Sequence, residues 1–196
     1  MKKTILYPVV LGTIFGILAG ISFAGKLIII TADGWAIGFY VVLYMFAAAL
    51  GGPLAGVLST TLCMLICVFF GYPELRTLAS DPVIFWTNVI VLGATMVLIS
   101  FLYRLIYHRF KMPLRLLPWI GVVLVYYLFG ISLLVTVQKL FSLVTIGVVE
   151  SWKGYIPQAL SDIVITSLIW FALPAKYHRP LWYEPKNEIS PVEGKV

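Results

Sequence analysis

Asp162 is the only Asp, Glu, Lys or Arg in the interior of any apolar segment of this chain that is long enough to span a membrane. A carboxylate in hydrocarbon costs about 3 kcal/mol on insertion scales, so it rarely lies there without a function or a partner. Gln158 precedes it by four residues and therefore lies on the same face of a helix. A carboxylate and an amide placed in this way can bind a polar group of a small molecule, or they can join two helices.

Aromatic and amide side chains lie at a similar depth in the neighbouring apolar segments. This mixture is typical of a pocket for a small, flat, polar molecule, in which rings stack and a few polar groups orient the ligand. The candidate substrate-binding residues are Asp162, Gln158, Trp86, Asn88, Tyr126, Trp152 and Lys153.

Each of these residues also has a purely structural interpretation. Trp152 can belong to the aromatic belt that forms at membrane interfaces regardless of function. Asn88 and Gln158 can hydrogen-bond between helices. Asp162 can form an ion pair with Lys153 or Lys139. The sequence leaves these alternatives open, and with them the charge of the ligand, since one carboxylate beside Lys153 suits a cationic, neutral or zwitterionic molecule.

The composition places these residues in a membrane protein. Of 196 residues, 61% are hydrophobic and only 11% are charged. A membrane-spanning helix needs about 20 apolar residues, and the sequence contains six such runs, some of them short: Ile5–Ala24, Trp35–Leu50, Leu54–Tyr72, Val83–Tyr107, Leu116–Val137 and Tyr155–Ala175. Gly51-Gly52-Pro53 predicts a tight turn between the second and the third. We therefore expect an all-α integral membrane protein, with a six-helix bundle over residues 1–176 and a disordered polar tail over residues 177–196.

The basic residues predict the orientation of the chain. With the N-terminus in the cytoplasm, ten of the 14 Lys and Arg residues fall on the cytoplasmic side and four outside. The positive-inside rule therefore predicts a protein of the cell membrane with both termini in the cytoplasm, and it explains the net charge of +6 without a nucleic-acid partner. An alternative is that residues 1–24 are a signal peptide cleaved after Ala24, which leaves five spans and an outer N-terminus.

The predicted topology places Asp162 in the outer part of the bilayer. Pro157 suits the first turn of the sixth helix, and Asp162 lies about 8 Å further along at 1.5 Å per residue. Two segments outside the helices are open to more than one interpretation. Gly25–Gly34 is rich in β-branched residues and forms either a flap over the bundle or an extension of the first helix. Leu140–Val149 either extends the fifth helix or lies on the surface.

Small residues at four-residue spacing form a ridge on the first helix at Gly12, Gly16, Gly20 and Ala24. Such a ridge allows another helix to approach closely. The helix that it meets can belong to the same bundle or to a partner protein, and the spacing alone favours the same bundle.

Enzyme chemistry has no support in the sequence. Cys63 and Cys67 are small hydrophobic residues on one helix face, and the histidines His108 and His178 lie elsewhere, so we expect neither a metal site nor a cofactor. Motifs for nucleotide binding and hydrolysis are absent from the sequence. If this protein transports a substrate against a gradient, another subunit or an ion gradient supplies the energy.

Residues from Ile5 to about Lys176 resemble the substrate-binding S components of energy-coupling factor vitamin transporters. The resemblance rests on the size, the topology, the ridge at Gly12, Gly16 and Gly20, the turn at Leu50–Gly56, and Ile156–Asp162 at the start of the last helix. It implies that a vitamin or related micronutrient binds in an outer pocket, and that Gly25–Gly34 is a gate. It further implies that a coupling membrane protein and two ATPase subunits drive uptake, and that the glycine ridge docks on the coupling protein.

Two alternatives belong to other classes of protein. Gly-Pro-Leu-Ala-Gly turns such as Gly52–Gly56 also occur in short multi-helix sensor domains attached to signalling enzymes, but this sequence ends in a short polar tail without a catalytic domain. A structural or assembly subunit of a larger membrane complex would use the same glycine ridge and would need no pocket.

Overall fold

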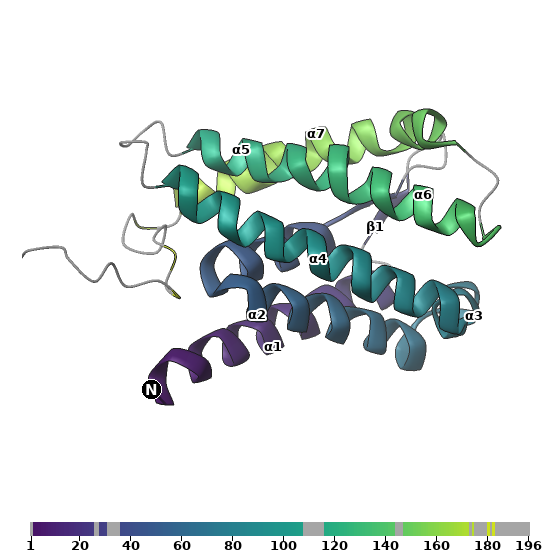
Figure 1. The fold of residues 1–196 in the computed structure, drawn as a ribbon, viewed down its shortest axis with the longest axis horizontal. Coiled ribbons are helices and arrows are strands. Elements are labelled where there is room, and N and C mark those ends of the chain that lie inside the picture. The colour runs from purple at the N-terminus through teal and green to yellow at the C-terminus, as the bar shows by residue number, and fades with distance from the viewer. Residues whose placement is uncertain are drawn as a thin grey trace, which may run out of the picture.

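The computed structural model describes residues 2–25, 28–30, 36–107, 116–143 and 147–172, together with residues 174, 180 and 182. Within these residues, five helices are long and apolar enough to cross a membrane by length and composition: Ile5–Ala24, Tyr40–Phe70, Pro82–Tyr107, Trp119–Leu140 and Tyr155–Ala172. The protein is therefore a helical membrane protein (Figure 1).

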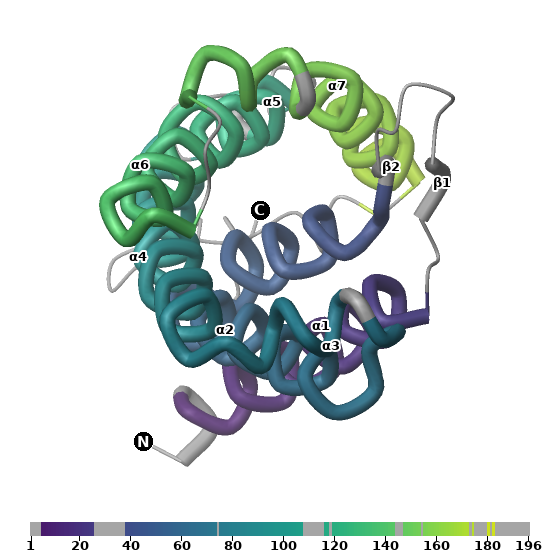
Figure 2. The backbone as a smooth tube through the Cα atoms, turned by 90° about the vertical axis from the view of Figure 1, so that its right-hand side faces the viewer, coloured from purple at the N-terminus to yellow at the C-terminus, as the bar shows by residue number. Residues whose placement is uncertain are grey.

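The helices run α1 (Lys2–Ala24), α2 (Tyr40–Phe70), α3 (Pro73–Ser80), α4 (Pro82–Tyr107), α5 (Leu116–Val125), α6 (Ser132–Leu140) and α7 (Val148–Ala172), with the π-helical segment η1 (Tyr126–Ile131) between α5 and α6. Viewed along the bundle, the first half of α2 lies in the middle, with α7 on one side of it and α1 on the other (Figure 2). The boundaries of the first, fourth and fifth apolar runs match α1, α4 and the continuous helix formed by α5, η1 and α6 to within a few residues.

Helix α2 contains the second and third predicted spans and breaks between them at Gly52. Gly52 has φ 85° and ψ −172°, which is not helical, and it is followed by Pro53. A Cβ atom on Gly56 would lie only 2.8 Å from the Cβ of Ala48. Residues eight apart in a straight helix are about 12 Å apart, so the two halves of α2 fold back on each other at the predicted turn.

The first half of α2 is surrounded by protein. Between Val41 and Gly52 every residue except Leu43 is buried. Across from it, the Ser100 hydroxyl on α4 donates a hydrogen bond of 2.8 Å to the Ala48 carbonyl oxygen. Because lipid does not reach this half of α2, its short length need not match the thickness of a bilayer.

The glycine ridge of α1 packs inside the molecule. A Cβ atom on Gly12 would lie 2.8 Å from the carbonyl oxygen of Ala55, and one on Gly16 would lie 2.9 Å from the Cα of Ser59. Gly20 is similarly close to Ile66, at 2.7 Å. All three glycines are buried. They bring α1 against the second half of α2, which is the same-bundle packing that their spacing favours.

Helix α7 begins earlier than the sequence indicates. It starts at Val148, so Pro157 lies inside the helix and not in its first turn. Proline is disfavoured in helix interiors because it loses one hydrogen bond and clashes with the preceding turn, which is why the sequence predicts a helix start there. The run Leu140–Val149 was predicted either to extend the fifth helix or to lie on the surface. In the structure α6 ends at Leu140 and α7 begins at Val148, so the run does not continue the fifth helix.

A pair of short strands follows α1. Strand β1 (Ile28–Ile30) pairs with β2 (Ala36–Gly38) in antiparallel register, with Ile29 opposite Ile37. The Gly25–Gly34 segment therefore does not extend α1, which ends at Ala24. Residues 26–27 and 31–35 lie outside the described residues, so the predicted gate is described only in part.

The two ends of the bundle differ in their packing. At one end, which we call the closed end, Trp119, Trp170, Tyr103 and Phe46 form a cluster of buried rings. The indole of Trp119 lies 4.4 Å from the Phe46 ring, 5.0 Å from Tyr103 and 5.5 Å from Trp170, measured between centroids. The other end, which we call the pocket end, carries Phe23, Tyr40, α3, the first turns of α4, and Gln138.

Most of the predicted tail, residues 177–196, lies outside the described residues, but Trp182 is described and packs on the closed end. Its indole Nε1 donates a 3.3 Å hydrogen bond to the Ala49 carbonyl oxygen, and its ring lies against Gly52. The Arg104 guanidinium lies 5.5 Å from the centroid of the same ring. This part of the tail is therefore attached to the turn in α2.

Candidate ligand pocket

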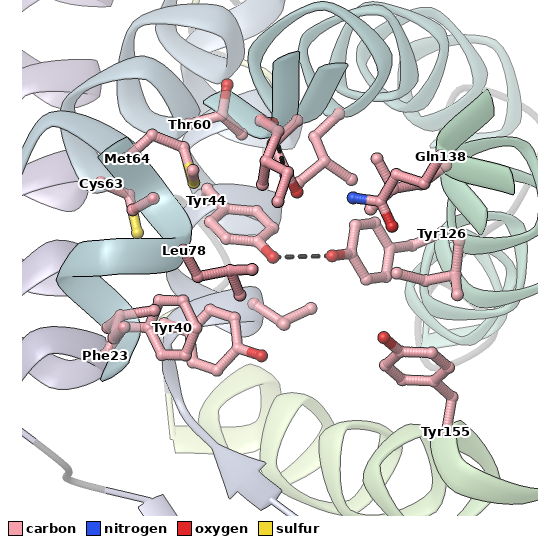
Figure 3. A pocket seen from close by; sticks show the side chains of 18 of the residues that line it. Phe23, Tyr40, Tyr44, Thr60, Cys63, Met64, Leu78, Tyr126, Gln138 and Tyr155 are labelled. Carbon is pink, nitrogen blue, oxygen red and sulfur yellow. Dashed lines mark hydrogen bonds between the residues drawn. The ribbon is translucent and has the colours of Figure 1, made fainter. Parts of the chain in front are cut away.

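A cavity of about 280 Å³ opens inside the pocket end of the bundle. Its walls come from α1, α2, α3, α4, η1, α6 and α7, and Figure 3 shows several of the side chains that face it. Its polar lining consists of Tyr40, Tyr44, Thr60, Cys63, Asn88, Tyr126, Tyr127, Gln138, Tyr155 and Gln158. Among the described residues, every side chain that lines this cavity is uncharged.

Five tyrosines form a connected series around the cavity. The ring centroids of Tyr40 and Tyr44 are 6.1 Å apart, those of Tyr44 and Tyr126 5.9 Å, those of Tyr126 and Tyr127 5.0 Å, and those of Tyr127 and Tyr155 6.2 Å. The hydroxyl oxygens of Tyr44 and Tyr126 lie 2.7 Å apart and share a hydrogen bond. This bond joins α2 to η1 across the bundle.

The π-helical segment η1 brings two of these tyrosines into the interior side by side. Tyr126 and Tyr127 are consecutive, and both are buried. Gly130, in the same segment, lets the backbone approach α4, since a Cβ atom there would lie 2.6 Å from the Thr95 methyl carbon. Short π-helical segments inside α-helices are frequently found at functional sites, and this one lies directly at the cavity.

Asp162 lies behind the cavity wall. It is fully buried, and its Oδ2 accepts a hydrogen bond of 2.5 Å from the Tyr127 hydroxyl. Its Oδ1 has no hydrogen-bond partner among the described residues. Lys139 and Lys153 are both exposed, so neither forms the ion pair that the sequence allowed for Asp162. Tyr127 lines the cavity and contacts the carboxylate, so it connects the two.

Gln158 lies one helical turn before Asp162 and lines the cavity itself. Only 4% of its surface is exposed, and its Nε2 makes no hydrogen bond of acceptable geometry. The amide lies next to the Tyr40 hydroxyl, which also lines the cavity. A buried donor without a partner costs about 1 to 3 kcal/mol, so this amide is placed as a ligand-binding group would be.

The structure brings three of the seven predicted site residues to the cavity wall, namely Gln158, Asn88 and Tyr126. Asn88 uses its Nδ2 for a 2.8 Å hydrogen bond to the Ile84 carbonyl oxygen of its own helix. Asp162 is adjacent to the cavity through Tyr127.

The other three predicted residues point away from the cavity. Trp86 is 58% exposed, and its ring meets Phe85 edge-on. The Trp152 indole donates a 2.7 Å hydrogen bond to the Ser132 hydroxyl, which ties α7 to α6. Lys153 is exposed on the next position of α7. Trp152 therefore fits the interface interpretation better than the pocket interpretation, and Trp86 and Lys153 do not line the cavity.

The sequence reasoning missed Tyr40, Tyr44, Tyr127 and Tyr155 as site residues. Tyr40 and Tyr44 are four apart and share a helix face, which is a usable signal. It was hidden because this part of α2 is apolar on all sides, so no face stands out. Tyr155 was indistinguishable from a residue of the interfacial belt.

Comparison with protein-family models, with curated proteins and with solved structures found no match to this chain. The class of protein that the fold and the site define is therefore a helical membrane protein with an uncharged, tyrosine-rich cavity at one end of its bundle. What the cavity binds must be argued from its own chemistry.

Proposed function

We propose that this protein is a membrane-embedded substrate-binding subunit, which captures a small, vitamin-like micronutrient for uptake driven by a partner energy-coupling module. The observation that carries the proposal is the cavity itself, together with the unpartnered Gln158 amide that faces into it. Ligand pockets in proteins are mostly apolar and aromatic with a few convergent polar groups. This cavity has that composition, and its volume suits a small ligand.

The proposal includes six crossings and cytoplasmic termini. The reversal of α2 at Gly52 supports counting its two halves as separate crossings, with the first protected from lipid by the rest of the bundle. The distribution of Lys and Arg supports an N-terminus in the cytoplasm. The pocket end, where α1 ends and α4 begins, then faces outward, as capture from outside requires.

The coupling membrane protein and the two ATPase subunits are also part of the proposal. Motifs for nucleotide binding are absent from this sequence, which supports an external source of energy. Gly12, Gly16 and Gly20, which the resemblance assigns to docking, are buried against α2. We therefore do not place the contact with the coupling protein on this ridge.

Ligand binding is tested with the full chain purified in lipid nanodiscs. Native mass spectrometry should detect a co-purified small molecule, and a panel of micronutrients should contain one that raises the melting temperature. Ala79, which is 2% exposed and lines the cavity, is changed to Phe to fill it. Ala94→Phe is the matched control, since Ala94 is exposed on α4. We expect Ala79→Phe to abolish binding and Ala94→Phe to retain it.

A second cavity variant and a separate test of the partner complete the experiment. Gln158→Leu keeps the volume of the side chain and removes the amide, so it serves where Ala79→Phe does not fold. If nothing in the panel binds, nothing co-purifies, and both cavity variants behave like wild type, the substrate-binding proposal is wrong. Pull-down from native membranes separately tests the partner. Recovery of a signalling enzyme or of an assembly complex, in place of a coupling protein with ATPases, would support the other classes of function.

A further inference from the structure

Among the described residues, Asp162 is the only buried Asp, Glu, Lys or Arg, and it lies beside the cavity. All described lining residues are uncharged, and the buried carboxylate of Asp162 lies just behind Tyr127. The basic residues described at this end, Arg76, Lys139 and Lys153, are exposed. A charge in a low-dielectric interior acts over longer distances than one in water. When it is ionised, Asp162 therefore gives the adjacent cavity a negative potential.

The Asp162 carboxylate is also incompletely satisfied. Tyr127 donates to Oδ2, but Oδ1 is buried without a partner among the described residues. A buried charge is costly unless a counter-charge or further hydrogen bonds compensate it. A cation held in the adjacent cavity would supply part of that compensation across one tyrosine ring.

The hydroxyl groups of the cavity tyrosines converge on the same space. Figure 3 shows the hydroxyl groups of Tyr40, Tyr44, Tyr126 and Tyr155 pointing toward the middle of the cavity. With the hydroxyl groups directed inward, the phenolic oxygens face the cavity, and each oxygen carries a partial negative charge and can accept a hydrogen bond. Oxygens gathered around an otherwise apolar space favour a positive charge with a low cost of desolvation, such as an alkylated ammonium or a pyridinium.

Gln158 adds a requirement on the ligand. Its Nε2 is a donor with no partner, and it lies at the cavity wall one turn from Asp162. A ligand that satisfies it carries a hydrogen-bond acceptor at a distance from the cationic group. The volume of about 280 Å³ equals that of about nine water molecules in the liquid, which limits the ligand to a small molecule.

We propose that the cavity is selective for a small organic cation that also carries a hydrogen-bond acceptor. The tyrosines Tyr40, Tyr44, Tyr126, Tyr127 and Tyr155 form the cage, Asp162 is the counter-charge behind it, and Gln158 donates to the acceptor. This inference rests on the proposed function, because it names the chemical class of the substrate for the same cavity.

Matched pairs of cation and neutral isostere test the proposal. Choline is compared with 3,3-dimethylbutan-1-ol, and N-methylpyridinium with toluene, by calorimetry and thermal shift on the full chain in nanodiscs. We expect at least one cation to bind about tenfold more tightly than its neutral isostere, because inward-pointing phenolic oxygens and a nearby carboxylate both favour positive charge. Choline, which carries a hydroxyl acceptor, should lose affinity in Gln158→Leu.

Charge variants identify the source of the preference. Asp162→Asn keeps the acceptor for Tyr127 and removes the charge, and we expect the preference for the cation to fall about tenfold. Asp81→Asn is the matched control. Asp81 caps α4 through hydrogen bonds to the Val83 and Ile84 amides, and asparagine caps a helix equally well, so the preference should not change. Gln158→Glu should increase it.

Contrary results overturn the cation assignment in distinct ways. Equal or tighter binding of the neutral isosteres would mean that Asp162 is protonated and that the cavity selects uncharged ligands. Failure of both cations to bind, while a neutral or anionic micronutrient binds in the panel described above, overturns the cation assignment and leaves substrate binding intact. Failure of the panel as well overturns both.

Discussion

The closed end and the pocket end of this bundle contain similar side chains in opposite states. At the closed end, aromatic rings contact each other until little space is left, and Trp119 and Trp170 are almost completely buried. At the pocket end, five tyrosines leave a cavity of about 280 Å³ between them. The unpaired amide nitrogen of Gln158 and the unpaired Oδ1 of Asp162 lie at or near this cavity, and at the closed end the indole nitrogen of Trp119 is also without a partner among the described residues. The comparison teaches that aromatic content alone does not decide between a core and a binding site.

The two ends should also differ in what they contribute. Stability is distributed unevenly over a protein, and the tightly packed closed end should contribute more of it than the open and polar pocket end. Substitutions at the closed end should therefore lower stability, and substitutions at the pocket end should change binding.

The largest effect on stability is expected from Trp119→Ala. Trp to Ala substitutions in cores cost about 3 to 5 kcal/mol. We expect about 3 kcal/mol here, because exposure to lipid in the unfolded helices reduces the transfer part of the cost. Thermal unfolding in nanodiscs measures this. Trp86→Ala is the control, with a change below about 0.5 kcal/mol, since Trp86 is 58% exposed. Equal effects of the two substitutions would contradict the assignment of the core to the closed end.

A smaller effect is expected where α1 meets α2. Gly16→Ala places a Cβ atom 2.9 Å from the Ser59 Cα, and overpacking against backbone costs about 1 to 3 kcal/mol. Gly121→Ala is the matched substitution, since nothing lies within 4 Å of its new Cβ. That variant should gain about 0.5 to 1 kcal/mol from lower flexibility of the unfolded chain. If Gly16→Ala instead is neutral for folding and prevents association with a partner, the ridge is a docking surface.

The hydrogen bond between Tyr44 and Tyr126 should contribute about 1 kcal/mol. Tyr44→Phe, Tyr126→Phe and the double variant form a thermodynamic cycle that isolates this contribution. We expect a coupling of about 0.5 to 1.5 kcal/mol in the ligand-free protein. A coupling near zero would show that the two hydroxyls do not meet and that the pocket end is more open than described.

The smallest effect on stability is expected from Gln158→Leu. The amide nitrogen is unpaired, so removing it should change the free energy of unfolding by less than about 0.5 kcal/mol, or raise it. The same substitution should weaken ligand binding about tenfold, because a hydrogen bond to a ligand in a dry cavity is lost. Calorimetry and thermal unfolding of one preparation give both numbers. A large loss of stability would place Gln158 in the core.

Several parts of the fold follow from local sequence. The limits of α1 and α4 and the turn at Gly52 were predicted from apolar runs and from Gly-Gly-Pro. The start of α7 was not, because Pro157 lies inside the helix against its usual preference. Of the candidate site, Gln158, Asn88 and Tyr126 were predicted from their depth, whereas Trp86, Trp152 and Lys153 lie at the same depth and face away. Depth can be read from the sequence, but direction cannot when a helix is apolar all round.

The sequence by itself determined that this chain is a helical membrane protein, where α1 and α4 lie, and that Asp162 is a costly carboxylate within one of the helices. These properties depend on the length and polarity of single segments. Only the tertiary structure decided that Asp162 pairs with Tyr127, that the glycine ridge of α1 is buried, and that Tyr40 and Tyr44 face Tyr126. Such contacts join residues far apart in the chain, and they depend on how each helix is rotated about its own axis by its neighbours.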